Sequence, residues 1–326
     1  MDRRKFVGTI VAGLIAAALA AEAQPVRRAY RIGWLTPAVL DQHSRAFREA
    51  LRGLGYVEGQ TVTFETRSAD DDIDQLPRLA AELVHSKVDI IVAVGPFAIL
   101  AARQATDTIP IVMAAGGSGA LIPSGIGANL ARPGGNVTGV MLSAELDAKR
   151  LELLLRAVPK ARKVGVLDPG FTPAEVKDVE ELQKVAKAAG VQLQLTAVES
   201  GRNGYERAFE SMVKAHVEAL LVPSDPRFFR DARQIIDLAE KRRIPAIYEW
   251  SSMAEDGGLM AYGPTFAELD GRAASFVDRI LKGANPGNLA IEQPTKFELV
   301  INLKTAKAIG LTVSRSLLLF AHEVIR

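Results

Sequence analysis

The feature that most constrains the fold of this chain is an internal repeat with an offset of about 130 residues. The segment Lys163–Gly170, KVGVLDPG, follows the same plan as Arg31–Pro37, RIGWLTP. After each copy come a helical pattern and three further strand-like runs. The later partners are 61–66 with 191–198, 88–96 with 217–226, and 109–115 with 244–250. A repeat this long is not a solenoid unit, and it predicts two similarly built lobes.

Strand-like and helical patterns alternate along the chain. This alternation predicts an α/β fold of two Rossmann-like lobes, with parallel sheets covered by helices on both faces. The run Val88–Val94 is β-branched and almost wholly apolar, as expected of a strand buried on both faces. The predicted strands are 30–35, 61–66, 88–94, 109–114, 137–142, 191–198, 244–250, 259–262 and 297–302, with further strand-like runs within the repeat segments 163–170 and 217–226. The predicted helices are 43–54, 76–84, 97–104, 146–157, 173–189, 205–215, 228–241, 267–281 and 303–309.

The repeat also predicts where the lobes begin and end. We expect residues 28–142 together with 265–326 to form the first lobe and residues 143–264 to form the second. The chain would cross between the lobes near 141–144 and return near 262–265, and both crossings are expected to act as hinges. The segment 297–309 has no counterpart in the second half of the repeat, so we expect it to pack on the first lobe.

Residues 1–23 have the composition of an export signal peptide. Arg3 and Arg4 precede an almost wholly apolar run at 7–21, and Ala21-Glu22-Ala23 is a small-x-small cleavage site. The apolar run is shorter than the roughly 18 residues of a membrane-spanning helix. The paired arginines favour the twin-arginine route, with an ordinary secretory leader as the alternative. Either route predicts a periplasmic protein.

Composition excludes several classes of function. The formal net charge is +2, which gives no reason to expect nucleic acid or an anionic membrane as partner. The chain has no cysteine, so disulfides, thiolate catalysis and Cys-ligated metals are excluded. The sequence also lacks G-x-S-x-G, G-x-x-x-x-G-K-[ST] and H-E-x-x-H. We therefore expect no catalytic residue, no metal site and no cofactor.

The candidate ligand site follows from the expected sheets. In parallel α/β sheets, ligands bind beyond the carboxyl ends of the strands, so two lobes with these ends facing each other enclose a cleft. Neutral residues and helix N-termini on the first lobe suit a carboxylate. Acidic and aromatic residues on the second lobe suit an ammonium and an apolar group. The candidate site residues are Thr36, Gly95, Pro96 and Ser118 on the first lobe, and Asp168, Ser224, Asp225, Glu249, Trp250 and Tyr262 on the second.

Each candidate also has a structural interpretation that the sequence leaves open. Asp225 precedes Pro226 and has the position of a helix cap, and Asp168 has the same option in its own turn. Trp250 and Tyr262 are residue types that often lie in a core or between lobes. His43 lies close to the end of the first strand and is the one histidine placed to reach a ligand.

Four segments resemble a known family. They are LARPGGNVTGV (130–140), GGLMAYGP (257–264), ILKG (280–283) and QPTKFELVINLKTAKAIGLTV (293–313). Together they resemble the ABC-transporter substrate-binding proteins that include tryptophan-binding members. The resemblance covers nearly the whole mature chain and implies two Rossmann-like lobes of the periplasmic-binding-protein type, joined by a hinge and without catalysis. At Ser118 and Gly119 the chain departs from relatives, which have an Asp-Pro pair in this loop, so the resemblance does not name the ligand.

The leading hypothesis is an exported, monomeric solute-binding protein. It would capture a small molecule, an amino acid-like zwitterion or carboxylate, in the interlobe cleft and deliver it to a membrane ABC permease. One alternative is the ligand-binding subunit of an exported sensor, built in the same way with a different partner. A two-lobed α/β enzyme is a further alternative, which the missing catalytic patterns disfavour.

Overall fold

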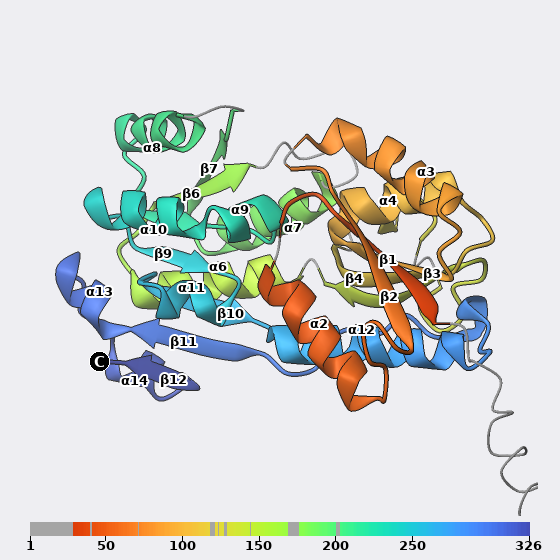
Figure 1. Ribbon diagram of the computed structural model, residues 1–326. Helices are drawn as coiled ribbons and strands as arrows, with labels where there is room; N and C mark the ends of the chain where they lie inside the picture. The colour runs from red at the N-terminus through yellow and green to blue at the C-terminus, as the bar shows by residue number, and fades with distance from the viewer. Residues whose placement is uncertain are drawn as a thin grey trace, which may run out of the picture.

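The computed structural model describes residues 29–39, 41–70, 72–117, 121–122, 124–126, 129–143, 145–168, 176–199 and 203–326. The predicted signal peptide, residues 1–23, and the candidate residue Ser118 lie outside the described residues. Figure 1 shows two lobes side by side, each built on a β-sheet flanked by helices. Pairing is parallel throughout the first sheet and dominates the second, which confirms the predicted α/β fold.

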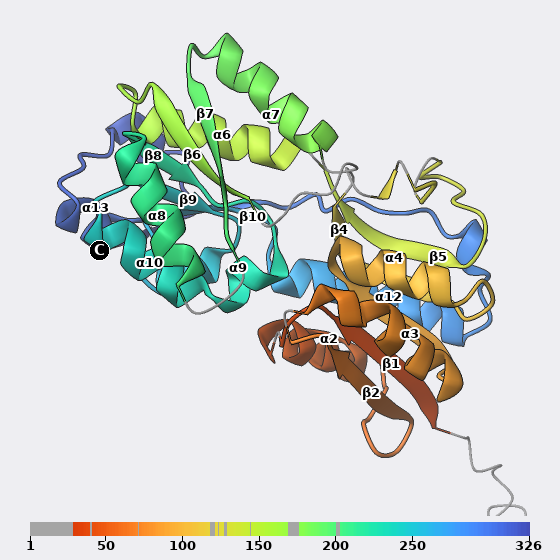
Figure 2. The ribbon, with the colours of Figure 1, turned by 90° about the horizontal axis from the view of Figure 1, so that it is seen from above.

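The first lobe is built on a parallel sheet whose order, in the described part of the chain, is β2-β1-β3-β4-β5. Helices α3 and α4 cover one face and α2 and α12 the other (Figure 2). The segment 289–292 runs beside β5, where Glu292 N–H donates to the Gly139 carbonyl over 2.9 Å. The elements are β1 (Tyr30–Thr36), α2 (Asp41–Gly53), β2 (Val62–Ser68), η1 (Ile73–Gln75), α3 (Leu76–His85), β3 (Ile90–Val94), α4 (Gly95–Ala105), β4 (Ile111–Gly117), β5 (Val137–Leu142), α12 (Phe266–Leu281) and η2 (Pro286–Asn288).

The second lobe is built on a sheet of order β12-β11-β10-β9-β8-β6-β7 within the described residues. Helices α6 and α7 cover one face, and α8, α10 and α11 cover the other. The elements are α6 (Glu145–Ala157), β6 (Lys163–Asp168), α7 (Val176–Ala188), β7 (Gln192–Ala197), α8 (Gly204–Lys214), β8 (Ala219–Leu221), α9 (Pro226–Arg230), α10 (Ala232–Lys241), β9 (Ala246–Tyr248), α11 (Ser251–Glu255), β10 (Met260–Gly263), β11 (Glu298–Asn302), α13 (Leu303–Ala308), α14 (Arg315–Leu318) and β12 (Glu323–Ile325).

The placement of the C-terminal tail on the first lobe was wrong. Strand β11 pairs antiparallel with β10, and β12 pairs with β11, so both strands extend the second sheet. Without β11, the edge of β10 would leave backbone N–H and C=O groups without partners. Leu299 and Ile301 fill the core on the α6 side of this sheet. The lack of a repeat partner does not determine which sheet edge a strand completes.

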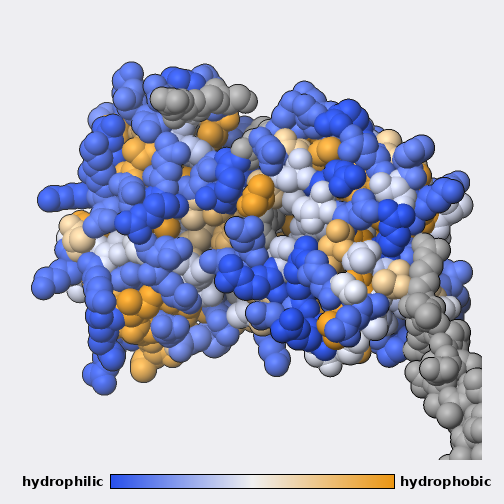
Figure 3. Space-filling model, in the orientation of Figure 1, coloured by the Kyte–Doolittle hydropathy of each residue, from blue (hydrophilic) through white to orange (hydrophobic). Residues whose placement is uncertain are grey.

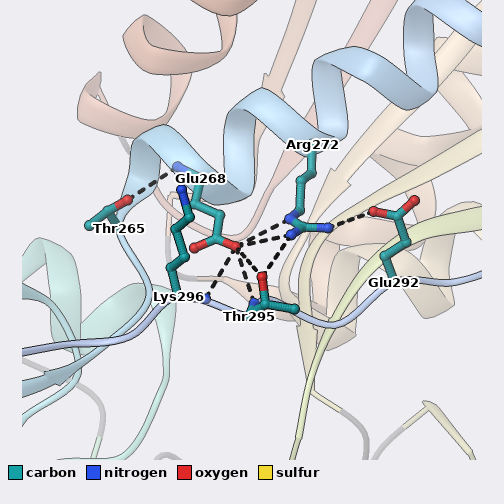
Figure 4. A network of polar contacts seen from close by, with 6 residues as sticks. All are labelled: Thr265, Glu268, Arg272, Glu292, Thr295 and Lys296. Carbon is teal, nitrogen blue, oxygen red and sulfur yellow. Dashed lines mark hydrogen bonds and ion pairs between the residues drawn. The ribbon is translucent and has the colours of Figure 1, made fainter.

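Because the tail belongs to the second lobe, the chain crosses between the lobes a third time, between η2 and β11 (Figure 2). A polar network ties this crossing to the start of α12 (Figure 4). Glu268 Oε1 accepts from the Thr295 backbone N–H at 3.1 Å and from Arg272 Nη2 at 3.2 Å. Arg272 Nη1 also donates to Glu292 Oε2 at 2.7 Å. Residues 292–296 are therefore attached to the first lobe, and the change of lobe falls next to Phe297.

The helix predicted over 228–241 is interrupted. Helices α9 and α10 meet at Asp231, whose φ of −90° and ψ of 14° leave the helical region. The Asp231 carboxylate accepts from the Tyr205 hydroxyl of α8 over 2.8 Å. This hydrogen bond ties the junction between α9 and α10 to α8.

Apolar packing continues from one lobe to the other. One cluster of buried residues joins the α2 and α12 face of the first sheet to the α8 and α10 face of the second. It includes Phe47 and Val92 from the first lobe and Phe209 and Ile235 from the second. On the face drawn in Figure 3, hydrophilic residues cover most of the surface of both lobes. The lobes therefore meet through a buried apolar contact in this arrangement.

Candidate functional site

The lobes touch where the carboxyl ends of their strands face each other. Gly95, with φ of +76°, follows β3 and begins α4 on the first lobe. A Cβ on Gly95 would lie 3.1 Å from Cγ of Pro226, which begins α9 on the second lobe. The Arg227 guanidinium carbon lies 6.0 Å from the centroid of the Phe97 ring. The strand ends predicted to form the site therefore do meet across the lobe boundary.

Four rings, His43, Phe229, Trp250 and Phe266, form an interlobe aromatic cluster. Phe266 of the first lobe stacks on Trp250 of the second, with centroids 4.3 Å apart and an interplanar angle of 18°. His43 of α2 makes edge contacts with Trp250 at 5.5 Å and with Phe229 at 6.3 Å. Aromatic pairs of this kind contribute about 0.5–1.5 kcal/mol beyond the area that they bury. The interlobe aromatic cluster therefore stabilises contact between the lobes.

A buried acid holds the histidine of this cluster. His43 Nδ1 lies 3.1 Å from both carboxylate oxygens of Asp270 on α12, and both side chains are almost fully buried. Burial raises the pKa of Asp270, and the neighbouring His43 offsets part of this effect. The pair fixes the orientation of the imidazole, so that the ring presents its edges to the second lobe.

Beneath the lobe boundary lies a buried ion cluster of Asp147, Arg150 and Glu249. Arg150 is 1% exposed and donates from Nη2 and Nε to Asp147 Oδ1, at 2.7 and 3.0 Å. Its Nη1 donates to the Tyr262 carbonyl at 3.3 Å and lies 3.6 Å from Glu249 Oε1. Arg150 therefore connects α6 to the ends of β9 and β10, at two of the crossings between the lobes.

Glu249 follows β9 directly and is 2% exposed. Among the described residues, neither of its carboxylate oxygens accepts a hydrogen bond with good geometry. Burial raises the pKa of Glu249, and the Arg150 guanidinium, the Ser224 hydroxyl and His43 offset only part of this rise. Burial lowers the pKa of Arg150, but Asp147 and Glu249 outweigh it and the pKa of the guanidinium is raised.

The structure gives several predicted site residues internal partners. The Thr36 hydroxyl donates to the Ala38 carbonyl at 2.7 Å. Asp225 caps α9: its Oδ1 accepts from the Arg227 backbone N–H at 2.8 Å and from Arg227 Nε at 2.9 Å. The Tyr262 ring stacks on Phe297, with centroids 5.9 Å apart. The helix-cap interpretation of Asp225 therefore holds, and its carboxylate is already bound within its own lobe.

The remaining predicted residues come at or after the ends of strands along the chain. Pro96 is the second residue of α4, and Trp250 belongs to the interlobe aromatic cluster. Ser224 is exposed in the loop between β8 and α9. Asp168 ends β6 at the carboxyl edge of the second sheet and is half-buried. Ser118 follows β4 and is outside the described residues.

Sequence reasoning missed Arg150, Asp147, Asp270 and Phe266. For Arg150 a signal was present, because Leu146, Arg150 and Leu154 recur every four residues along the buried stripe of α6. A charge on an apolar helical stripe indicates a buried ion pair. Phe266 and Asp270 gave no such signal, since they meet His43 only through the packing of α12 on α2.

A hollow with a volume of about 650 Å³ lies beside the crossings between the lobes. It is lined by Leu146 and Lys149 of α6, by the stacked Tyr262 and Phe297, and by Pro294 of the third crossing. Within the described residues, no group of acidic or histidine side chains has a spacing that would hold a metal ion.

Comparisons with known proteins show which proteins this chain resembles. Residues 35–325 match the family described as ABC transporter substrate binding protein. A tyrosine-binding protein from Clostridioides difficile (strain R20291) is 28% identical over 275 residues, which span 83% of this chain and 77% of that protein.

Solved structures show the same fold. An ABC domain from Streptococcus pneumoniae in complex with L-Trp is 25% identical and overlays with a TM-score of 0.82, covering 91% of this chain and all of that one. The ligand-free, open structure of a substrate binding protein with adhesive properties from Clostridium difficile is 23% identical. Its TM-score is 0.63, over 91% of this chain and 99% of that one.

Proposed function

The chain belongs to the family of ABC transporter substrate-binding proteins, and we propose that it captures an amino acid-like zwitterion or carboxylate between its lobes and delivers it to a membrane ABC permease. Its family consists of binding proteins rather than enzymes. The main support for this ligand class is that strand ends of opposite charge preference lie at the boundary between the lobes. The first lobe brings the N-terminus of α4, and the second brings the buried carboxylate of Glu249.

The polarity of the two sides suits a zwitterion. Helix α4 spans 11 residues from Gly95, and the backbone N–H groups of a first turn favour an anionic group such as a carboxylate. Glu249 on the opposite side favours a cation. The named ligands of two relatives, tyrosine and L-Trp, are amino acids with aromatic side chains, which supports this ligand class.

Binding and release need the lobes to separate and close. We expect rotation about the crossings near 141–144 and 262–265, together with the third crossing next to Phe297. The networks of Arg150 and Glu268 support these positions, because each network ends where the chain passes from one lobe to the other. A ligand that contacts both lobes shifts the population toward the closed form.

The direct test is capture of the natural ligand. Protein purified from its native periplasm is denatured, and the released small molecules are identified by mass spectrometry. The expected result is one enriched amino acid or related carboxylate, released unchanged. This ligand should rebind to the refolded protein, and the complex should contain one protein chain. Enrichment of a sugar or another neutral solute contradicts the proposed ligand class. Chemical conversion of the added ligand contradicts a transport role.

Export to the periplasm is part of the proposal. In the described part of the chain, no helix is long and apolar enough to cross a membrane. Replacement of Arg3 and Arg4 by lysine should block export, because the twin-arginine receptor reads the guanidinium pair. Mature protein should begin at Gln24, which N-terminal sequencing of the periplasmic fraction checks. Undiminished export of the double-lysine variant would instead assign the general secretory route.

A further inference from the structure

We propose that Glu249 binds a protonated amino group of the ligand and that Arg150 and Asp147 hold Glu249 in position. This inference rests on the proposed function, because it identifies the residue that selects the ligand class at the same interlobe site. Three carboxylates, Asp168, Asp225 and Glu249, follow strands of the second sheet, and the contacts of Glu249 distinguish it.

The first observation is the incomplete hydrogen bonding of Glu249. Its side chain is 2% exposed, and within the described residues neither oxygen accepts a hydrogen bond with good geometry. A buried carboxylate without partners is costly, and protein interiors rarely keep one. Asp225 differs, because the N-terminus of its own helix and Arg227 already bind its oxygens. Glu249 is therefore the acid with capacity for a donor that arrives with the ligand.

The second observation is the imbalance of charge in the buried ion cluster. Arg150 donates its two shortest hydrogen bonds to Asp147 and a longer one to the Tyr262 carbonyl. The distance that remains between Nη1 and Glu249 Oε1, 3.6 Å, is longer than a hydrogen bond. When Glu249 is ionised, two carboxylates share one guanidinium, and a single added positive charge balances the cluster. An ammonium supplies this charge together with up to three N–H donors.

The third observation is the rigid setting of the Glu249 side chain. A Cβ on Gly263 would lie 3.0 Å from Glu249 Cγ and 2.3 Å from the Glu249 carbonyl oxygen. The stem of Glu249 therefore packs directly on the backbone of β10. The next residue along the chain, Trp250, makes an edge contact with His43 over 5.5 Å, and His43 lies close enough to influence the charge of Glu249. These contacts orient the carboxylate before the ligand arrives.

Binding of an ammonium at this site is linked to proton release. Without ligand, burial favours the neutral form of Glu249, and a bound ammonium favours the ionised form. The groups that face Glu249 are Arg150 and Asp147 from α6, Ser224 from the β8–α9 loop, and His43 from α2, with Asp270 behind it. As the pH falls through the pKa of the ligand-free carboxyl, affinity for an ammonium falls, because the proton must first leave.

The test compares amino acids with analogues that lack only the amine. Ligand-free wild-type protein is titrated calorimetrically with L-tryptophan, L-tyrosine and L-leucine, and with their deamino counterparts indole-3-propionate, 3-(4-hydroxyphenyl)propionate and 4-methylpentanoate. The amino acid that binds should do so about thirtyfold or more tightly than its counterpart, since truncating one partner of a buried charge pair has effects of this size.

The same titrations are repeated with Glu249→Gln, which keeps the shape of the side chain and removes its charge. This variant should bind the amino acid about thirtyfold or more weakly and the deamino analogue about as well as the wild type does. Titrations in two buffers of different ionisation enthalpy, between about pH 5 and pH 7, should show proton release on binding to the wild type and none for the variant. Glu206→Gln is the matched control, because Glu206 lies on α8, where it binds Gln234 of α10 away from the lobe boundary.

The outcomes separate the two proposals. Amino acid binding that is insensitive to Glu249→Gln, or deamino analogues that bind as tightly as amino acids, overturns the role of Glu249 and leaves the proposed function standing. Absence of binding by every amino acid, with binding of another class of solute, overturns the proposed ligand class and the role of Glu249 together.

Discussion

At the scale of single residues, two members of the buried ion cluster, Arg150 and Glu249, carry charges where water does not reach them. Taking Arg150 and Glu249 out of water costs free energy that their mutual attraction offsets only in part. The cost shows in Glu249, whose pKa is raised above its ordinary value of 4.5 by burial. In the proposed role of Glu249, a ligand of opposite charge would relieve this cost on binding.

The raised pKa of Glu249 predicts how stability depends on pH. A folded-state pKa above the unfolded one means that the folded protein binds more protons, so this group stabilises the fold at low pH. The contribution is full below 4.5 and is lost as the pH rises through the raised folded pKa. Urea unfolding of ligand-free protein should therefore show Glu249→Gln gaining stability relative to the wild type as the pH increases from about 4.5 to 8. A constant difference in the free energy of unfolding across this range contradicts the prediction.

At the scale of elements, strand β11 completes the second lobe although it lies more than thirty residues beyond β10 along the chain. Between them, α12 covers the first sheet and the third crossing returns to the second. Ile301 is 1% exposed and pairs with Met260. The Asn302 side chain then caps α13, accepting from the backbone N–H groups of Lys304 and Thr305. Within a few residues, the tail thus adds a core side chain and a strand to the second lobe and begins α13.

Replacement of Ile301 by alanine tests this placement. Loss of a fully buried side chain should lower the free energy of unfolding by about 2–5 kcal/mol, as measured by urea denaturation. Native-state hydrogen exchange should accelerate in β10 and β9, and exchange in β1 and β3 of the first sheet should change little. Val213→Ala on the exposed face of α8 is the control and should have little effect on stability. If hydrogen exchange accelerated only in the first sheet, the tail would instead pack on the first lobe.

At the scale of the whole molecule, the two lobes are in direct contact. The interlobe aromatic cluster and the approach of Gly95 to Pro226 contribute direct contacts to this closed arrangement. The proposed closure on a ligand would add to an interface that these contacts already stabilise. The equilibrium between open and closed forms is accordingly set by both the ligand and the stacked rings.

Phe266→Ala should shift the ligand-free ensemble toward open forms. The substitution removes the stack on Trp250 and the edge contact with Phe229, both across the lobe boundary, and the edge contact with His43 within the first lobe. Small-angle X-ray scattering should show a larger radius of gyration for the ligand-free variant than for the wild type, and a saturating ligand should reduce the difference. Phe320→Ala, at a ring 60% exposed in the tail, is the control and should leave the radius of gyration unchanged. Equal values for wild type and Phe266→Ala would show that the stack does not hold the lobes together.

The sequence by itself determined the local structure and the plan of the molecule. Periodicity located β1, β3, β5, α2 and most later elements near their observed ends, because each element is built from neighbouring residues whose side-chain spacing reflects its geometry. The repeat implied two lobes, and the rule on parallel strand ends brought Gly95, Glu249 and Trp250 to one boundary. These inferences need only short-range pattern and the handedness of βαβ units.

Only the tertiary structure decided which lobe the tail completes and how the acids differ. An open strand edge is satisfied by hydrogen bonds between distant residues, so the position of β11 beside β10 left no trace in local periodicity. Asp225 and Glu249 both follow neighbouring strands of the second sheet, yet Asp225 is bound by its own helix and Glu249 lies beside a buried guanidinium from α6. The state of a carboxyl group depends on burial and on charges from other elements, and both are fixed by packing in three dimensions.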